Sequence, residues 1–131
     1  MNADEMKDRT QEFALRVINL VESLPNTRTG DVLGKQLLRS GTSVGANYRA
    51  ACRARSDAEF IAKLGIVEEE TDESIYWIEL IAKANLMKIS RVKNLLDEAN
   101  QILSIVIASI NTTKRKKKNN PKSEIRNPKS L

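Results

Sequence analysis

Four basic side chains at helical intervals form the group in this sequence that is best suited to binding chemistry. The four are Lys35, Arg39, Arg49 and Arg53. At about 100° per residue they fall within roughly 80° of one another on a helix, and a rise of about 1.5 Å per residue spreads them over roughly 27 Å. The intervening positions on this side carry the small residues Thr42 and Ala46. A long basic face with only small side chains between its cations is suited to binding a phosphate backbone or the acidic helix of a neighbour.

The basic face therefore has two interpretations. In the first, the three arginines each bind a phosphate through two N–H donors, which predicts binding to RNA or DNA. In the second, they pair with the acidic run at residues 68–73, either within the chain or across an interface. Such surface pairs contribute roughly 0 to 1 kcal/mol each, but they can determine the partner and the register. The residues alone leave both interpretations open.

A second basic group lies near the end of the chain. It consists of Lys114, Arg115, Lys116, Lys117 and Lys118. A run of this kind binds RNA or DNA by releasing counterions, without sequence preference. It is therefore a candidate nucleic-acid site, although any such run binds in low salt.

The acidic run is also a candidate metal site, because Glu68 with Asp72 and Glu69 with Glu73 have i, i+4 spacing. Metal-binding helical bundles combine inward-facing glutamates with histidine, however, and this sequence has no histidine. The apolar stripe also passes between these acids. The pattern therefore favours a solvated or interface face, and we expect no metal and no cofactor.

The cysteine and histidine counts exclude much catalytic chemistry. Cys52 is the single cysteine, so zinc sites and nucleophiles that depend on imidazole cannot be assembled within one chain. Cys52 itself is expected to be a buried thiol. The prediction is a protein that is not an enzyme.

The net charge of +5 is unevenly distributed. From Lys114 onward the chain has eight basic residues and one acidic residue, a net of +7, so residues 1–113 carry a net charge of −2. The argument for an acidic partner must therefore rest on where the body places its charges. No apolar run approaches the length of about 20 residues that spans a membrane, and residues 1–8 lack the apolar core of a signal peptide. We expect a cytoplasmic protein without membrane contact.

The composition and periodicity predict helices. Aromatic residues make up 4% of the chain, and five glycines and three prolines are present. Apolar stripes predict a first helix over residues 4–24 and a second over residues 32–53, with Thr29 or Asp31 as the N-cap of the second. Gly34, Gly41 and Gly45 share one strip of that second helix. They indicate a close approach of another helix or, alternatively, a kink near residues 40–43.

Two further helices complete the pattern. Ser56-Asp57-Ala58-Glu59 fits a capping box, which predicts a third helix that runs to about Asn85 and is the longest. Ser90 is expected to cap the fourth helix, in which the apolar pattern stops at Ile110. Four helices with short connections predict an all-α, antiparallel up-down four-helix bundle over residues 1–112. Residues 113–131 are predicted to be a disordered basic tail.

The tail contains a seven-residue repeat, in which NPKSEIR at residues 120–126 is followed by NPKS. Each unit contains a proline and at most one large apolar residue, so the repeat does not indicate a coiled coil. Disorder is one interpretation, and a recent coding extension without function is the other.

Several apolar residues lie away from the four stripes. They are Leu15, Ile75, Trp77 and Leu80. Their natural use is an oligomer interface, and the alternative is a wider core or scattered exposure. Trp77 and its neighbour Tyr76 could stack on bases, but they lie beside acids and belong to no aromatic series. We therefore expect them to be interface anchors.

A family resemblance follows from the centre of the chain. The segments SGTSVGANYR at residues 40–49 and RSDAEF at residues 55–60 resemble the signature of the 23S rRNA intervening-sequence proteins, as do QLLR at 36–39 and ETDESIYWIEL at 70–80. The resemblance covers about residues 10–110. It implies an antiparallel four-helix bundle that assembles as a homopentamer, with Gly41 and Gly45 at the oligomer interface.

The resemblance also implies kinship with the accessory variability determinant of diversity-generating retroelements, a bacterial protein that binds nucleic acid and a reverse transcriptase. Many family members carry Glu-Gly where this chain has Ala50-Ala51, and a basic pair where it has Asp57-Ala58. The second difference lowers the positive charge at the start of the third helix. The leading hypothesis is a homo-oligomer that binds RNA or DNA, and the alternative is a protein–protein adaptor without nucleic-acid binding.

Overall fold

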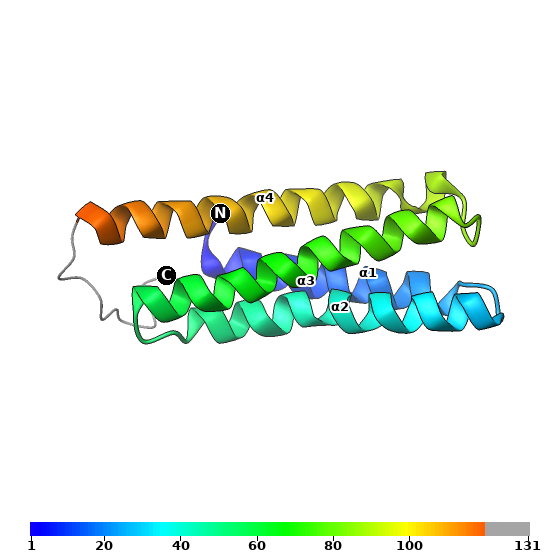
Figure 1. Cartoon of the computed structure of the whole chain (residues 1–131), viewed down its shortest axis with the longest axis horizontal. Coiled ribbons are helices and arrows are strands. Elements are labelled where there is room, and N and C mark those ends of the chain that lie inside the picture. The colour runs from blue at the N-terminus through cyan, green and yellow to red at the C-terminus, as the bar shows by residue number, and fades with distance from the viewer. Residues whose placement is uncertain (120–131) are drawn as a thin grey trace.

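The computed structural model describes residues 1–119, which form four helices connected by short turns. They are α1 (Ala3–Glu22), α2 (Arg28–Cys52), α3 (Asp57–Lys83) and α4 (Ile89–Asn119). Successive helices run in opposite directions along one long axis, so that α1 and α3 point one way and α2 and α4 the other (Figure 1). The predicted all-α, antiparallel up-down bundle is confirmed.

Local side-chain hydrogen bonds determine where the first helices begin. The side-chain oxygen Oδ1 of Asn2 accepts the Glu5 N–H at 2.8 Å, and Thr27 Oγ1 accepts the Gly30 N–H at 3.0 Å. Thr27 is therefore the N-cap of α2, and the expectation that Thr29 or Asp31 caps this helix is wrong. Both of those residues lie inside the helix, because Thr27 provides an earlier acceptor in the required extended conformation.

The predicted start of α3 is confirmed, whereas that of α4 is wrong. Ser56 caps α3 as expected, with its hydroxyl accepting the Glu59 N–H at 3.1 Å, while the Glu59 carboxylate accepts the N–H of Arg55. The prediction that Ser90 caps α4 is wrong, since α4 already begins at Ile89. With 31 residues, α4 rather than α3 is the longest helix.

The C-terminal boundary of the bundle also differs from the expected one. Helix α4 continues through Asn119, and Thr113 is buried with a relative exposure of 9%. Residues 113–119 are therefore helical and belong to the bundle instead of the expected tail. The predicted disorder and the repeat at residues 120–131 lie outside the described residues.

The core lies between the four helices and contains the predicted apolar stripes. Its largest completely buried side chains include Phe13, Leu37, Leu64, Ile78 and Ile102. Ile75, expected at an oligomer interface, is buried in the same core, so that assignment is wrong within this chain. Of the other expected interface residues, Leu15 is 51% exposed, while Trp77 and Leu80 are half-buried.

Two glycines of α2 allow α1 to approach closely. A Cβ at Gly41 would lie 2.8 and 2.9 Å from the two methyl groups of Val17, and one at Gly45 would lie 3.2 Å from Thr10 Oγ1. Helix α2 is continuous through this region, so the alternative of a kink at residues 40–43 is wrong. The two glycines serve packing between α1 and α2 inside one chain, and their expected role at an oligomer interface stays a prediction.

Polar side chains inside the bundle are hydrogen-bonded. Ser74 donates to Ser40 Oγ at 3.0 Å and so connects α3 to α2. Helices α1 and α4 pack less closely than the other neighbouring pairs, and Arg9 joins them through two hydrogen bonds of 2.7 and 2.8 Å to the Glu98 carboxylate. No helix within residues 1–119 combines the length and apolar content needed to cross a bilayer.

Candidate nucleic-acid interface

The structure places the four predicted cations of α2 on one exposed side of a continuous helix. Lys35, Arg39, Arg49 and Arg53 are all exposed, while Leu37, Val44 and Tyr48 on the opposite side are buried. The helical spacing read from the sequence therefore produced the expected grouping. The four differ, however, in what surrounds them.

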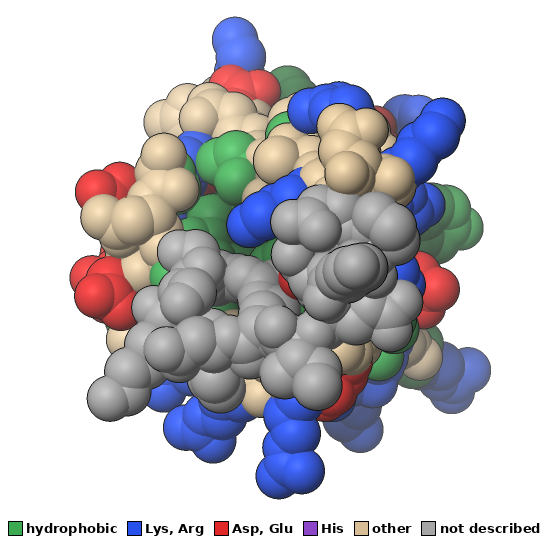
Figure 2. All heavy atoms as spheres, turned by 90° about the vertical axis from the view of Figure 1, so that its left-hand side faces the viewer, with side chains coloured by type: hydrophobic (Ala, Val, Ile, Leu, Met, Phe, Trp, Pro, Cys, Tyr) green, Lys and Arg blue, Asp and Glu red, His purple; other side chains and the backbone are tan. Residues whose placement is uncertain are grey.

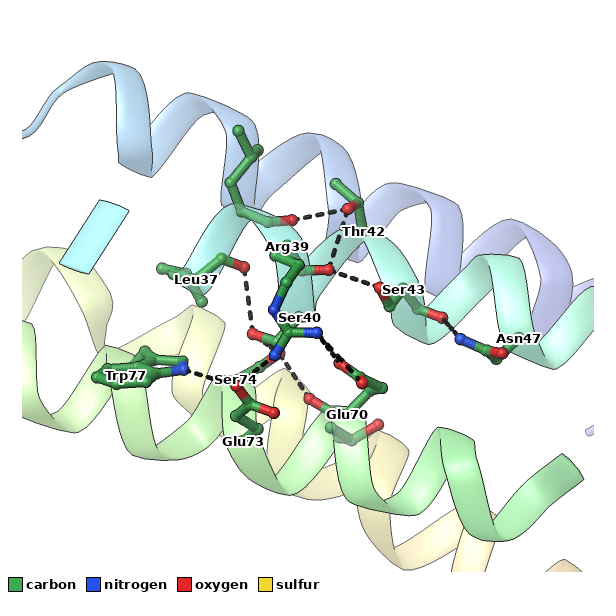
Figure 3. Close-up of polar contacts among 12 residues, drawn as sticks. Leu37, Arg39, Ser40, Thr42, Ser43, Asn47, Glu70, Glu73, Ser74 and Trp77 are labelled. Carbon is green, nitrogen blue, oxygen red and sulfur yellow. Dashed lines mark hydrogen bonds and ion pairs between the residues drawn. The ribbon is translucent and has the colours of Figure 1, made fainter. Parts of the chain in front are cut away.

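Arg39 is paired with the acidic run of α3. Its Nη2 donates to the Glu73 carboxylate, and its Nη1 lies 3.4 Å from Glu70 Oε2 (Figure 3). The indole Nε1 of Trp77 donates to the same Glu73 carboxylate at 3.2 Å. Arg39 therefore follows the second interpretation, in which a cation of the basic face pairs with residues 68–73 of its own chain.

These contacts shift the titration of both partners. The hydrogen bond from Arg39, followed by that from Trp77, lowers the pKa of Glu73 below its usual value, and Glu73 in turn raises the pKa of Arg39. A lowered pKa means that the ionised Glu73 stabilises the folded state above its unfolded pKa. This contribution is lost as the pH falls through the lower, folded-state pKa.

We predict that Arg39→Gln raises the pKa of Glu73 toward the usual value of a glutamate, because the largest cause of the shift is removed. The measurement is an NMR titration of the side-chain carboxyl carbons. Arg28→Gln, an exposed change at the beginning of α2, is the control and leaves the titration unchanged. A Glu73 pKa that stays equally low in both variants would contradict the pairing. The stability change is small, because the pair is exposed and the solvent screens it.

The other three cations have no such partner. Among residues 1–119, no ion pair includes Lys35, Arg49 or Arg53. Arg49 lies in the last turn of α2 and Arg53 is its C-cap residue, where the partial negative charge of the helix end favours cations. Arg55 follows in the turn to α3 and is also exposed. Arg55 was not among the cations predicted from the sequence, because it lies outside the helical spacing of the other four.

The second basic group meets this end of α2 in space. Helices α2 and α4 run in the same direction, so their C-termini lie at the same end of the bundle (Figure 1). Lys114, Arg115, Lys116 and Lys118 are exposed in the last turns of α4, and Lys117 is half-buried. We call Arg49, Arg53, Arg55 and residues 114–118 the basic end.

Figure 2 looks along the bundle onto the basic end, where Lys and Arg side chains gather at the lower edge and at the upper right. Acidic side chains are gathered mainly on the left of the same view. The first turns of α1 and α3 contribute four acids to this end, namely Asp4, Glu5, Asp57 and Glu59. The eight basic residues outnumber them, so the end as a whole is positive.

A pocket of about 430 Å³ opens at the same end, between the start of α1, Tyr48 of α2, the first turn of α3 and residues 105–116 of α4. Its buried part is formed by Tyr48, Asp57, Phe60 and Thr113, and its rim includes Lys116. This pocket was not predicted from the sequence. Its lining residues come from all four helices or their caps, and no sequence spacing connects them.

The remaining candidate sites have different surroundings. Within residues 1–119, no three Asp, Glu, Cys or His side chains group as metal ligands would. Tyr76 is 56% exposed, and its ring lies edge-on to that of Trp77 with centroids 5.0 Å apart. Both rings lie near Glu73, whose charge repels the phosphates of a stacked strand. Their role as interface anchors stays a prediction.

Comparisons with known proteins agree with the fold. The sequence profile described as 23S rRNA-intervening sequence protein matches residues 4–108. The chain is also similar to a solved structure from Bacteroides thetaiotaomicron, a protein of unknown function from the S23 ribosomal protein family. The two are 39% identical, with a TM-score of 0.75 over 80% of this chain and 97% of that one. No curated protein matches the sequence. The chain belongs to the 23S rRNA-intervening sequence protein family.

Proposed function

We propose that this protein binds RNA through its basic end, as a homo-oligomer and without catalysing a reaction. The observation that supports this most directly is the position of eight basic residues from two helices at one end of a body that is otherwise slightly acidic. None of the eight forms an ion pair with another residue of the described range 1–119. Arg39 is not part of the proposed site, because Glu70 and Glu73 already neutralise it.

The magnitude of the charge favours binding to phosphates. The partial charges of about −0.5 at the ends of α2 and α4 are balanced by about +0.5 at the starts of α1 and α3, which lie at the same end. Only the four acids Asp4, Glu5, Asp57 and Glu59 therefore offset the eight cations. Each phosphate of a single strand that the protein contacts releases counterions. The slope of log K against log salt therefore becomes steeper by about 0.7 for each contact. Arginine can also bind one phosphate through two donors, which lysine cannot.

Assembly into a homo-oligomer is supported by the outer surface of α1. Leu15 and Ile18 lie one turn apart and are 51% and 37% exposed, so they form an apolar strip that a second copy can cover. A homopentamer would present five basic ends. Several ends on one assembly increase the apparent affinity for a long strand without any new type of contact.

The proposal predicts that the full-length variant Arg49→Gln/Arg53→Gln/Arg55→Gln binds a 20-nucleotide single-stranded RNA at least tenfold more weakly in low salt. Because three phosphate contacts are lost, the slope of log K against log salt decreases in magnitude by about two. Fluorescence anisotropy across a salt series measures both. Light scattering on the same samples checks that the variants keep the assembly of the native chain.

The matched control removes three exposed cations from the opposite end, as Arg28→Gln/Lys83→Gln/Lys88→Gln. We expect this variant to bind like the native protein. Equal weakening by the two variants would show that total charge, and not the basic end, determines binding. A native chain without salt-dependent affinity would contradict the proposal and favour the protein–protein adaptor.

A further inference from the structure

A different pocket lies between α1 and α4, at the end of the bundle opposite to the basic end (Figure 1). We call it the α1–α4 pocket. Its volume is about 320 Å³, close to the lower limit of the range of about 300–1,000 Å³ that is usual for small-molecule sites. Its lining comes from the last turns of α1, the turn before α4 and the first turns of α4. Because α1 and α4 pack less closely than the other neighbouring pairs, the space between them stays open at this end.

The lining of the α1–α4 pocket combines two arginines with neutral residues. Arg16 comes from α1 and Arg91 from α4, and neither forms an ion pair with another residue of the range 1–119. Among the described residues, no acid contributes to the lining. The other lining residues are either exposed and polar, as Asn19, Ser23 and Asn94 are, or buried and apolar, as Leu20, Met87 and Leu95 are.

The surroundings leave the charge of the two arginines in place. The negative partial charge at the end of α1 and the positive one at the start of α4 meet at this pocket and offset each other. The first turn of α4 contains no acidic residue. Glu98, one turn beyond the pocket on α4, is already held by Arg9 through two hydrogen bonds. The α1–α4 pocket is therefore positive and favours an anion.

The number of donors selects a phosphate monoester among small anions. One guanidinium binds a carboxylate through two parallel N–H donors, so one arginine is sufficient for a carboxylate. A phosphate monoester has three terminal oxygens and a charge of about −1.5 to −2 at neutral pH, so it can accept from two arginines at once. Arg16 and Arg91 supply two such groups, and the side-chain amides of Asn19 and Asn94 can donate further hydrogen bonds.

The apolar base of the pocket indicates what is attached to the phosphate. Leu20, Met87 and Leu95 form this base, and a phosphate bound by the arginines would not cover it. An apolar or aromatic group attached to the phosphate can pack there. The polarizable sulfur of Met87 makes favourable contacts with aromatic rings. A mononucleotide combines the required anion with a ring of this kind.

We propose that the α1–α4 pocket binds a small phosphate monoester, with the phosphate between Arg16 and Arg91 and the organic group over the apolar base. This inference goes beyond the proposed function, because the pocket and the basic end lie at opposite ends of the bundle. The exposed strip of Leu15 and Ile18 lies roughly 120° around α1 from the side that lines the pocket. A second copy that covers the strip therefore leaves the pocket open.

Calorimetric titrations of the full-length protein in low salt test the chemistry of the ligand. We expect saturable binding of adenosine 5′-monophosphate, weaker binding of inorganic phosphate, which lacks the organic group, and no binding of adenosine, which lacks the phosphate. Equal binding of adenosine and its monophosphate, or no saturable binding of the monophosphate, would overturn the proposal.

Variants test the position of the site. Arg16→Gln/Arg91→Gln is expected to weaken the binding of adenosine 5′-monophosphate by about tenfold or more, because charge-assisted hydrogen bonds are lost. Arg16→Lys/Arg91→Lys retains the charge but not the paired donors, so its affinity is expected to lie between those of the native chain and the glutamine variant. The matched control, Arg28→Gln/Lys93→Gln, removes the same charge from exposed positions at this end that do not line the pocket, and it binds like the native protein. Equal weakening by the glutamine variant and its control would overturn the assignment.

The two ends of the bundle are separated by one further variant. Arg49→Gln/Arg53→Gln/Arg55→Gln, which weakens the basic end, is expected to bind adenosine 5′-monophosphate like the native chain. A loss of this binding would place the phosphate at the basic end and overturn the pocket assignment. In the same variant, octauridylate with a 5′-phosphate is compared with the 5′-hydroxyl strand. Tighter binding of the phosphorylated strand would identify an RNA end as a source of the phosphate, and equal binding would restrict the pocket to free monoesters.

Discussion

Replacing Phe13 with alanine is expected to lower the free energy of unfolding by about 3–5 kcal/mol. Phe13 lies in the middle of α1 with a relative exposure of 0%, and it is among the largest completely buried side chains. Its removal exchanges an apolar contact surface for a cavity that the surrounding helices can fill only in part. Because α1 packs loosely against α4, much of its attachment depends on this core contact. Urea unfolding followed by circular dichroism measures the change.

The control for this variant lies two residues away in the same helix. Leu15 is 51% exposed, so Leu15→Ala is expected to change the stability by no more than about 0.5 kcal/mol in dilute protein. A larger effect that depends on protein concentration would indicate that Leu15 is covered in the homo-oligomer. A loss below about 1 kcal/mol for Phe13→Ala would contradict the core described for α1.

Replacing Gly41 with leucine is expected to destabilise the bundle by about 3 kcal/mol, near the upper end for overpacked cores. Even the first added carbon would lie 2.8 and 2.9 Å from the methyl groups of Val17, which is itself completely buried. Helices α1 and α2 must then separate along their whole contact. The gain of about 1 kcal/mol from removing a helical glycine offsets part of this cost. The shift of the urea midpoint reports the net effect.

Gly65 provides the matched comparison, because it is a glycine inside α3 with no heavy atom within 4 Å of an added Cβ. Gly65→Leu is therefore expected to leave the stability unchanged or to raise it by up to about 1 kcal/mol. The two substitutions change the same residue type to the same side chain, so their difference isolates packing from helix propensity. Similar effects at both positions would refute the close contact between α1 and α2.

The cations of α2 illustrate how one surface pattern divides into two roles. Arg39 and Arg53 have similar helical positions, but Arg39 lies opposite Glu70 and Glu73 while Arg53 lies at the end of the helix. The pairing at Arg39 is consistent with a contact that sets how α2 and α3 lie against each other. The remaining cations stay available to a partner, and the cations of α4 reinforce those at the end of α2.

The sequence alone was sufficient for features that depend on residues close together in the chain. Apolar spacing identified all four helices and their core faces, and the capping box placed the start of α3 at Ser56. These features follow from hydrogen bonds and side-chain contacts over three or four positions. The wrong N-caps predicted for α2 and α4 arose where several polar residues lie within one turn. Apolar spacing does not determine which of them is the N-cap. The continuation of α4 was missed because Thr113 becomes buried only against other helices.

Only the tertiary structure decided which cations are paired, where Gly41 and Gly45 find their contacts, and how the candidate site is composed. Arg39 and Glu73, like Gly41 and Val17, are separated by more than 20 positions. The ends of α2 and α4 are more than 60 positions apart, and the pocket joins Asn2 to Lys116. Such contacts depend on the direction, rotation and length of each helix in the bundle. A helical repeat specifies one face of one helix, whereas the contacts between faces are determined by how all four pack together.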